Sequence, residues 1–208
     1  MESGIQTARY DQNGRWFSCS HHQTIRCGEP LRPAQGVSDS HCPSDYWKTA
    51  VDELLWIWQK KSNNVHDLKS HIWDSWADET GSIGKAYGYQ LGVKHHYKEG
   101  DFDQVDRILY DLKHNPLSRR IMSNIYNHHD LSEMHLYPCA YSMTFNVSGD
   151  TLNGILNQRS QDMLTANSWN VCQYAVLMHM FAQASGLKVG ELVHVIADAI
   201  FMTATFLW

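Results

Sequence analysis

The sequence predicts a single α+β domain. Its 208 residues are enough for one domain with a sizeable core. Stretches with apolar residues at helical spacing occur together with stretches in which apolar and polar residues alternate. The two kinds of stretch do not follow each other in the regular order of a doubly wound fold, and neither a linker nor an internal repeat divides the chain.

Four segments are predicted to be helical. Residues 48–58 have apolar side chains at helical spacing and predict a buried helix, and residues 65–68 predict a short one. Residues 104–114 form an amphipathic pattern that Asn115 and Pro116 end. Residues 170–185 predict a long apolar helix that ends at Gly186.

Strands are predicted between and after these helices. Residues 121–126 and 192–196 are strand candidates. Residues 141–147 alternate, Gly149 and Asp150 suit a turn, and residues 152–156 are again apolar. This pattern predicts a β-hairpin.

Composition gives no indication of a nucleic-acid or membrane partner. The formal net charge is −5, and no apolar run is long enough to span a bilayer. An odd count of five cysteines without a CxxC pair argues against a disulfide framework and favours a reducing cytosol. Among the thirteen histidines, we expect the adjacent pairs at 95–96 and 128–129 in solvated loops. No metal-ligand pattern is present, so no metal site is predicted.

The strongest chemical candidate is Cys139, which follows Pro138 directly. A thiolate is a nucleophile that needs a nearby positive charge to lower its pKa, and the guanidinium of Arg159 could supply it. The predicted hairpin could fold Arg159 back beside Cys139. From these residues alone, a buried small Cys139 and a surface Arg159 are equally well supported.

The rest of the chain, from Trp47 to Asp198, resembles thymidylate synthase. The matching segments keep the family's order and spacing: 53–59, 71–79, 86–90, 115–120, 137–139, 158–160, 169–171 and 190–194. The resemblance implies a mixed β-sheet with packed helices, and a homodimer in which two sheets pack face to face. It also implies reductive methylation of dUMP to dTMP, with 5,10-methylenetetrahydrofolate as the co-substrate that becomes dihydrofolate.

The resemblance assigns phosphate binding to a set of arginines and one hydroxyl, which suits a phosphate group. Arg159 and Ser160 match ligands from the same subunit. Arg119 and Arg120 match ligands donated across the dimer, and Arg9 matches a further one. Without the resemblance, the pair at 119–120 would be a solvated pair after a proline turn.

The resemblance also assigns the chemistry of the pyrimidine ring. The Cys139 thiolate adds to C6 of dUMP, Glu53 works through water on O4 and on the folate, and Tyr87 belongs to the network that removes the C5 proton. Asn170 matches the residue that reads the uracil amide, where an aspartate would suggest a dCMP hydroxymethylase. Buried in a helix, Glu53 would have a raised pKa; the alternative is a helix-surface glutamate.

Three further residues match the folate site. Trp73 and Trp76 match aromatic residues beside the folate, and Asp162 matches the pterin-binding aspartate. A core position is the alternative for each tryptophan. Ile200 and Met202 stand where the family has the His and Tyr that hold the deoxyribose 3′-hydroxyl.

Both ends of the chain depart from the family. Back-translated with permitted codons and read one base later, residues 19–43 encode AHTIKRFGVVN followed by RYDLRKEFPILTV, which resembles the family's N-terminal strands. Residues 199–208 similarly encode HIYDRHIPL, which resembles the segment after the matched Asp198. We therefore expect one domain over 1–208 that is truncated at its C-terminus, with residues 14–46 out of frame.

Three functions stay open at this point. The first is a thymidylate synthase-like methyltransferase. The second is an inactive or nucleotide-binding remnant of that family. The third is an unrelated cysteine hydrolase, which would need a histidine base near Cys139, and only His135 is close in the sequence.

Overall fold

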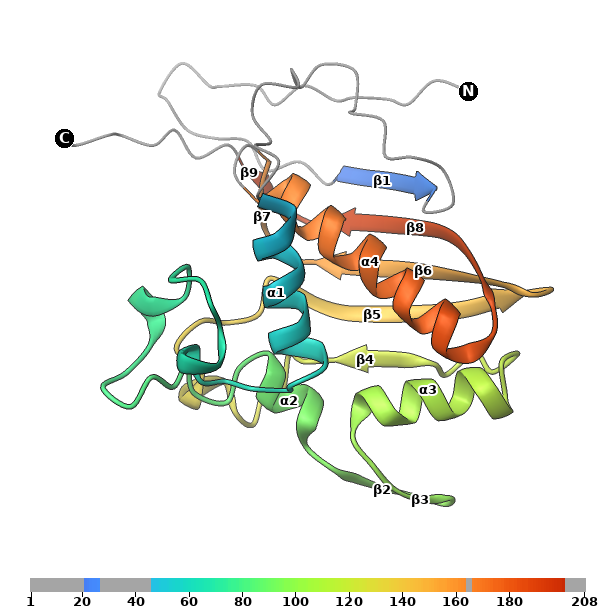
Figure 1. Cartoon of the computed structure of the whole chain (residues 1–208), viewed down its shortest axis with the longest axis horizontal. Helices are drawn as coiled ribbons and strands as arrows, with labels where there is room; N and C mark the ends of the chain where they lie inside the picture. Colours follow the sequence, from blue (N-terminus) through green and yellow to red (C-terminus); the bar gives the residue numbers. More distant parts are fainter. Residues whose placement is uncertain (1–20, 27–45, 164–165, 201–208) are drawn as a thin grey trace.

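A mixed five-stranded sheet forms the centre of the molecule (Figure 1). The structure is a computed structural model that describes residues 21–26, 46–163 and 166–200. The strand order is β1-β8-β6-β5-β4, with β6 and β8 parallel and the other neighbours antiparallel. The strands are β1 (His21–Arg26), β4 (Met122–Asn124), β5 (Ala140–Ser148), β6 (Thr151–Gln158) and β8 (Lys188–Ile196). The α+β prediction with a mixed sheet is therefore confirmed.

The predicted hairpin is the pair β5–β6. Gly149 has φ of 63°, the left-handed conformation that suits a glycine in a tight turn. The register places Ala140 opposite Gln158 at the open end of the hairpin. This pairing brings together the residues just before β5 and just after β6.

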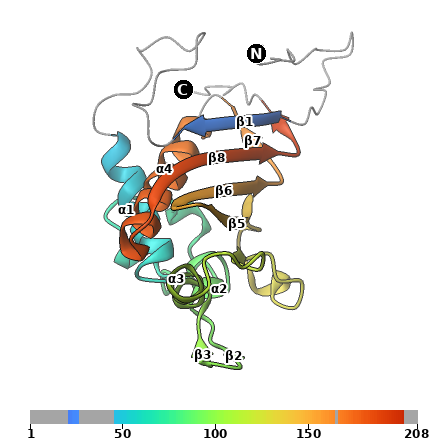
Figure 2. The same cartoon turned by 90° about the vertical axis from the view of Figure 1, so that its right-hand side faces the viewer.

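Two helices pack on one face of this sheet (Figures 1 and 2). They are α1 (Tyr46–Trp58) and α4 (Asn167–Ser185). The ring of Phe181 in α4 lies 5.2 Å from Phe145 in β5 and 5.9 Å from Trp58 in α1, measured between centroids. These contacts join both helices to the sheet, and α4 ends as predicted at Gly186, whose φ is 71°.

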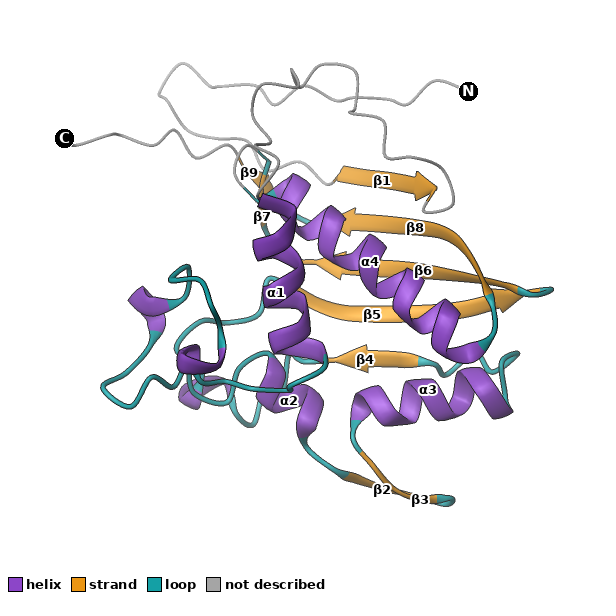
Figure 3. Ribbon diagram, in the orientation of Figure 1, coloured by secondary structure: helices purple, strands orange, loops and turns teal. Residues whose placement is uncertain are grey.

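The segment between the first helix and β4 is mostly loop and turn at its start (Figure 3). It contains the 3₁₀ helices η2 (Val65–Asp67) and η3 (Asp74–Trp76) and the short helix α2 (Gly88–Gly92). Then come β2 (His95–Tyr97), β3 (Gly100–Phe102) and α3 (Gln104–His114). Asp103 caps α3 by accepting from the Asp106 N–H at 3.0 Å.

Helix α3 matches its predicted bounds, but two neighbouring predictions need correction. The pair at 95–96 lies in the β2–β3 hairpin instead of a loop, although both side chains are exposed. Strand β4 is shorter than predicted, since only residues 122–124 pair with β5. The pair at 128–129 lies in an exposed turn as expected, before η4 (Leu131–Glu133).

Two short strands complete the fold beside the candidate site. Strands β7 (Gln161–Asp162) and β9 (Ala199–Ile200) pair in parallel. Of residues 14–46, the segment predicted to be out of frame, the structure describes β1, which pairs antiparallel with β8, and Tyr46, the first residue of α1. The remainder of residues 14–45 and residues 201–208 lie outside the described residues, so both frame predictions stay predictions. None of the helices in the described ranges has the length and apolar character needed to cross a membrane.

Candidate active site

The open end of the β5–β6 hairpin holds Cys139 and Arg159 together. The backbone N–H of Arg159 donates to the Cys139 carbonyl at 2.9 Å. The Arg159 side chain donates from Nε to the Pro138 carbonyl at 3.0 Å and from Nη2 to the Tyr137 carbonyl at 2.9 Å. The guanidinium is thus fixed against the segment that carries the thiol, as the hairpin predicted.

The electrostatic consequence differs from the expectation. Cys139 is a free, partly buried thiol, and burial raises its pKa. The charge of Arg159 lowers the pKa, but by less than burial raises it. Arg159 therefore supplies the pKa-lowering charge that the sequence suggested, but the burial of Cys139 outweighs it.

Tyr87 lies against the same segment. Its hydroxyl oxygen accepts from the Cys139 backbone N–H at 3.3 Å. Its φ of 44° is unusual for a bulky side chain, so the chain holds Tyr87 in a strained conformation. Burial raises the pKa of Tyr87 far above its ordinary value, and the phenol stays protonated and able to donate.

Glu53 forms a second polar centre, on the inner side of α1. It is 7% exposed, so it is a buried carboxylate and not a helix-surface glutamate. Oε1 accepts from the Trp73 indole N–H at 2.6 Å. Oε2 accepts from the Trp169 indole N–H at 2.5 Å and from the Gln173 amide at 2.7 Å. Burial raises the pKa of Glu53, while these three hydrogen bonds act to lower it.

Sequence reasoning missed two of these three donors. Trp169 stands next to the assigned Asn170, and Gln173 follows it by three positions, on the same side of a helix. The available signal was the polar Gln173, which lies three residues after Asn170 in a segment predicted to be an apolar helix. Without the tertiary fold, nothing in the sequence brings either residue to Glu53.

The two assigned tryptophans lie in contact with each other. Their ring centroids are 5.5 Å apart, and Trp73 lies 5.0 Å from the ring of Tyr87. Trp73 is 7% exposed and belongs to the core, whereas Trp76 is 39% exposed. Trp76 therefore presents part of its apolar ring at the surface. Asp162, the third assigned residue, lies buried in β7.

Asn170 and Ser160 are linked through Gln158, the last residue of β6. The Gln158 side-chain amide donates to the Ser160 carbonyl at 3.0 Å and to Asn170 Oδ1 at 3.3 Å. Gln158 Oε1 lies 2.9 Å from Nε2 of the fully buried His194. The assigned residues from α4 and from the end of β6 are thus brought together.

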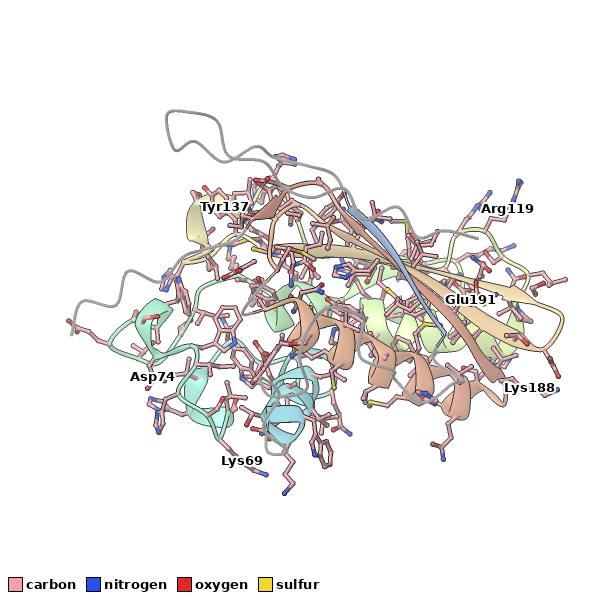
Figure 4. All side chains as sticks on the ribbon, turned by 90° about the horizontal axis from the view of Figure 1, so that it is seen from above. Lys69, Asp74, Arg119, Tyr137, Lys188 and Glu191 are labelled. Atoms are coloured by element: carbon pink, nitrogen blue, oxygen red, sulfur yellow. The ribbon has the colours of Figure 1, made fainter. Side chains whose placement is uncertain are left out.

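The remaining assigned arginines are not part of this cluster. Arg119 and Arg120 are exposed in the turn that follows α3. Figure 4 shows Arg119 and Tyr137, a neighbour of Cys139, at opposite ends of the molecule. Arg9 and Met202 lie outside the described residues, and Ile200 pairs with Asp162 in the β7–β9 ladder.

The surroundings of His135 offer no support for a cysteine hydrolase. Its exposed ring places Nδ1 2.9 Å from the Trp76 carbonyl. This contact holds the His135 ring against the segment that carries Trp76. Within the described ranges, no group of three His, Cys, Asp or Glu side chains is arranged to hold a metal ion.

The fold and the site define a class of protein: a mixed sheet with packed helices that holds a free thiol beside a guanidinium and a phenol, and a buried carboxylate on indole and amide donors. The family model for thymidylate synthase matches residues 43–203. The chain belongs to the thymidylate synthase family.

Individual relatives agree with the family assignment. The thymidylate synthase of Bacillus licheniformis is 42% identical over 209 aligned residues, which cover 95% of this chain and 74% of the relative. That of Bacillus subtilis subsp. natto is 48% identical, with the same shares covered. Among solved structures, the thermostable thymidylate synthase A from Bacillus subtilis matches with a TM-score of 0.77 at 38% identity. That match covers 92% of this chain and 70% of the solved one.

Proposed function

We propose that this chain performs the reaction of its family, the reductive methylation of dUMP to dTMP with 5,10-methylenetetrahydrofolate. The single observation that carries the proposal is the placement of Cys139, Arg159 and Tyr87 around one point, with backbone and side-chain hydrogen bonds joining them. The folate supplies the one-carbon unit and the hydride. A reducing cytoplasm suits an enzyme that depends on a free thiol.

In this proposal Cys139 adds to C6 of the uracil ring. The addition needs a thiolate, and burial works against it in the unliganded chain because it raises the pKa of Cys139. The guanidinium of Arg159 lowers that pKa and also binds the nucleotide phosphate with Ser160. Substrate binding and activation of the nucleophile therefore depend on the same side chain.

Glu53 and Tyr87 carry the protons. A buried carboxyl group with a raised pKa can exchange a proton with water at O4 of the pyrimidine. The neutral phenol of Tyr87 can hold the water that takes the C5 proton, since it lies directly on the nucleophile segment. Trp76 and Asp162 flank the space proposed for the folate.

A second copy of the chain completes the site. Leu156 in β6 and Leu192 in β8 face the helices and are fully buried. Ile155, Val193 and Val195 alternate with such buried residues along the same strands and are only partly buried. The same face of β6 also carries the polar Asn153 and Asn157, and such a mixed face can pack against its own copy. In that dimer, Arg119 and Arg120 reach the partner's phosphate, which explains their distance from Tyr137 in their own chain (Figure 4).

A specific observation favours a second candidate, a nucleotide-binding remnant that does not turn over. Ile200 stands in β9 next to Asp162, where the resemblance implies a side chain that holds the 3′-hydroxyl. An isoleucine has no hydrogen-bonding atom. A chain with this residue can keep the cysteine and the arginines and still position dUMP poorly.

Covalent capture of 5-fluoro-dUMP in the presence of methylenetetrahydrofolate tests the proposal. Intact-protein mass spectrometry should detect a ternary adduct that disappears in Cys139→Ser and persists in the control Cys172→Ser. Release of tritium from C5-labelled dUMP separates the two candidates, because only the enzyme releases it. A folded chain that forms no adduct would contradict the enzymatic proposal.

A further inference from the structure

A chain of side-chain amides connects the two polar centres of the site. Gln158 donates to Asn170 Oδ1 at 3.3 Å, and Asn170 Nδ2 donates to Gln173 Oε1 at 3.2 Å. Gln173 Nε2 donates in turn to Glu53 Oε2 at 2.7 Å. The order of donors and acceptors along this chain runs in one direction, from the sheet through α4 to α1.

The orientation of the Gln173 amide is dictated by its partners. Its Nε2 faces two acceptors, the Glu53 carboxylate and the Ala50 carbonyl at 3.0 Å. Neither partner can donate to an amide oxygen while Glu53 is ionised. Gln173 is 4% exposed, so water cannot replace these bonds, and a rotated amide would set its oxygen against the oxygens of Glu53 and Ala50. The Gln173 Oε1 atom therefore faces Asn170.

Asn170 is in consequence held from both sides. Its NH₂ group must face Gln173, because that neighbour presents an oxygen. Its Oδ1 must face Gln158, whose NH₂ is fixed in turn by the Ser160 carbonyl. The Asn170 amide has one N–H and one lone pair more than these two contacts use. Asn170 thus keeps a donor and an acceptor in fixed positions for a ligand.

We propose that Gln173 is the positioning residue that makes Asn170 selective for uracil over cytosine. This inference rests on the proposed function, in which Asn170 reads the pyrimidine. Uracil presents a donor at N3 and an acceptor at position 4, and cytosine presents the reverse. A freely rotating asparagine amide can match either base. An Asn170 amide that Gln173 holds in one orientation matches uracil alone. Against cytosine, its NH₂ group would face the donor of the base and its Oδ1 would face the acceptor.

The arrangement also links base recognition to the acid–base group. The lock depends on Glu53 as an acceptor, so the same carboxylate that exchanges protons with the substrate fixes the amide that reads it. Gln173 is hydrogen-bonded to both Asn170 and Glu53. Its loss should therefore change selectivity more than overall affinity.

Two substitutions test the inference. Gln173→Met keeps the volume and removes all three side-chain hydrogen bonds of Gln173. Gln173→Asn keeps an amide that is too short to span Asn170 and Glu53. Gln183→Met, at an exposed position on the same helix, is the control. Since the Asn170 amide is a group of the unliganded chain, its side-chain hydrogen exchange can be followed by ¹⁵N NMR without any nucleotide. We expect exchange to accelerate by about tenfold or more in both Gln173 variants and to stay unchanged in the control.

The second measurement is the ratio of dissociation constants for dUMP and dCMP, obtained by isothermal titration calorimetry. We expect the preference for dUMP to fall by about tenfold in the Gln173 variants, with the control unchanged. Equal weakening of both nucleotides would reduce Gln173 to a structural role and overturn the inference. If the unsubstituted chain binds neither nucleotide, the proposed function fails. The exchange rates then decide the inference alone, and unchanged rates in both variants would refute it.

Discussion

Glu53→Gln is the substitution whose outcome the structure defines most fully. The carboxylate accepts three hydrogen bonds, one at Oε1 from Trp73 and two at Oε2 from Trp169 and Gln173. A glutamine at this position has one oxygen and one NH₂ group. Its oxygen can serve the two donors that converge on Oε2, and its NH₂ group then faces the Trp73 indole N–H.

The size of the effect follows from this count. Relative to the ionised carboxylate, one buried indole N–H loses its acceptor, which costs about 1–3 kcal/mol. For a chain of this length, that corresponds to a decrease in Tm of roughly 2–12 °C. Loss of a general acid–base group lowers kcat by about 10²–10⁴-fold.

The stability difference should also depend on pH, with a defined sign. Burial raises the pKa of Glu53 above its ordinary value of 4.5, so the folded chain binds this proton more tightly than the unfolded chain. The stability that this proton contributes is fully present below pH 4.5 and is lost as the pH rises through the raised pKa. Glutamine does not titrate. The difference between the unsubstituted chain and Glu53→Gln should therefore be largest near pH 4.5 and narrow as the pH rises.

Differential scanning calorimetry from pH 4.5 to 9 measures this difference, with tritium release from C5-labelled dUMP as the activity assay. Glu79→Gln, the same change at an exposed position, is the matched control and should leave Tm unchanged. If the stability difference between the unsubstituted chain and Glu53→Gln stays constant or widens as the pH rises, the assignment of a raised pKa to Glu53 is refuted. An unchanged Tm would refute the hydrogen-bond count.

Three further substitutions have defined outcomes. Tyr87→Phe leaves the Cys139 N–H without its 3.3 Å acceptor and removes the proposed water-holding group. Tritium release should therefore slow by about 10²-fold while the 5-fluoro-dUMP adduct still forms. An equal loss of tritium release and of adduct would place Tyr87 in substrate binding instead. Arg159→Met removes the charge that lowers the Cys139 pKa, so that pKa should rise further and alkylation by iodoacetamide at pH 8 should slow; an unchanged or faster rate would contradict the charge argument. Gly186→Ala places a Cβ at φ of 71° with open space around it, so urea denaturation should report a loss of about 1 kcal/mol from backbone strain alone, and no loss would contradict it.

The local parts of the fold could be predicted because short-range patterns define them. The amphipathic spacing over 104–114, followed by Asn115 and Pro116, gave α3 its correct bounds. The alternation around Gly149 gave the hairpin, and the hairpin gave the contact between Cys139 and Arg159. The hairpin contact spans few residues, so it depends on little besides local sequence.

The parts that could not be predicted depend on long-range packing. The β2–β3 hairpin is a short exposed ladder whose histidines give no strand signal. The raised pKa of Cys139 reflects burial, which is a property of the assembled fold, whereas the sequence indicated only the neighbouring charge. The donors from Trp169 and Gln173 to Glu53 likewise require α4 to pack on α1.

The separations along the chain also order the assembly of the site during folding. Closing the β5–β6 hairpin brings Arg159 to Cys139 across a short loop, which is a fast event with a small entropic cost. The contact between Glu53 and Trp169 joins residues 116 positions apart and must wait until both helices dock on the sheet. A folding intermediate with the hairpin formed would thus carry a reactive cysteine before it carried the acid–base group. Thiol labelling during refolding would therefore modify Cys139 before the hydrogen bonds between Glu53 and its donors have formed.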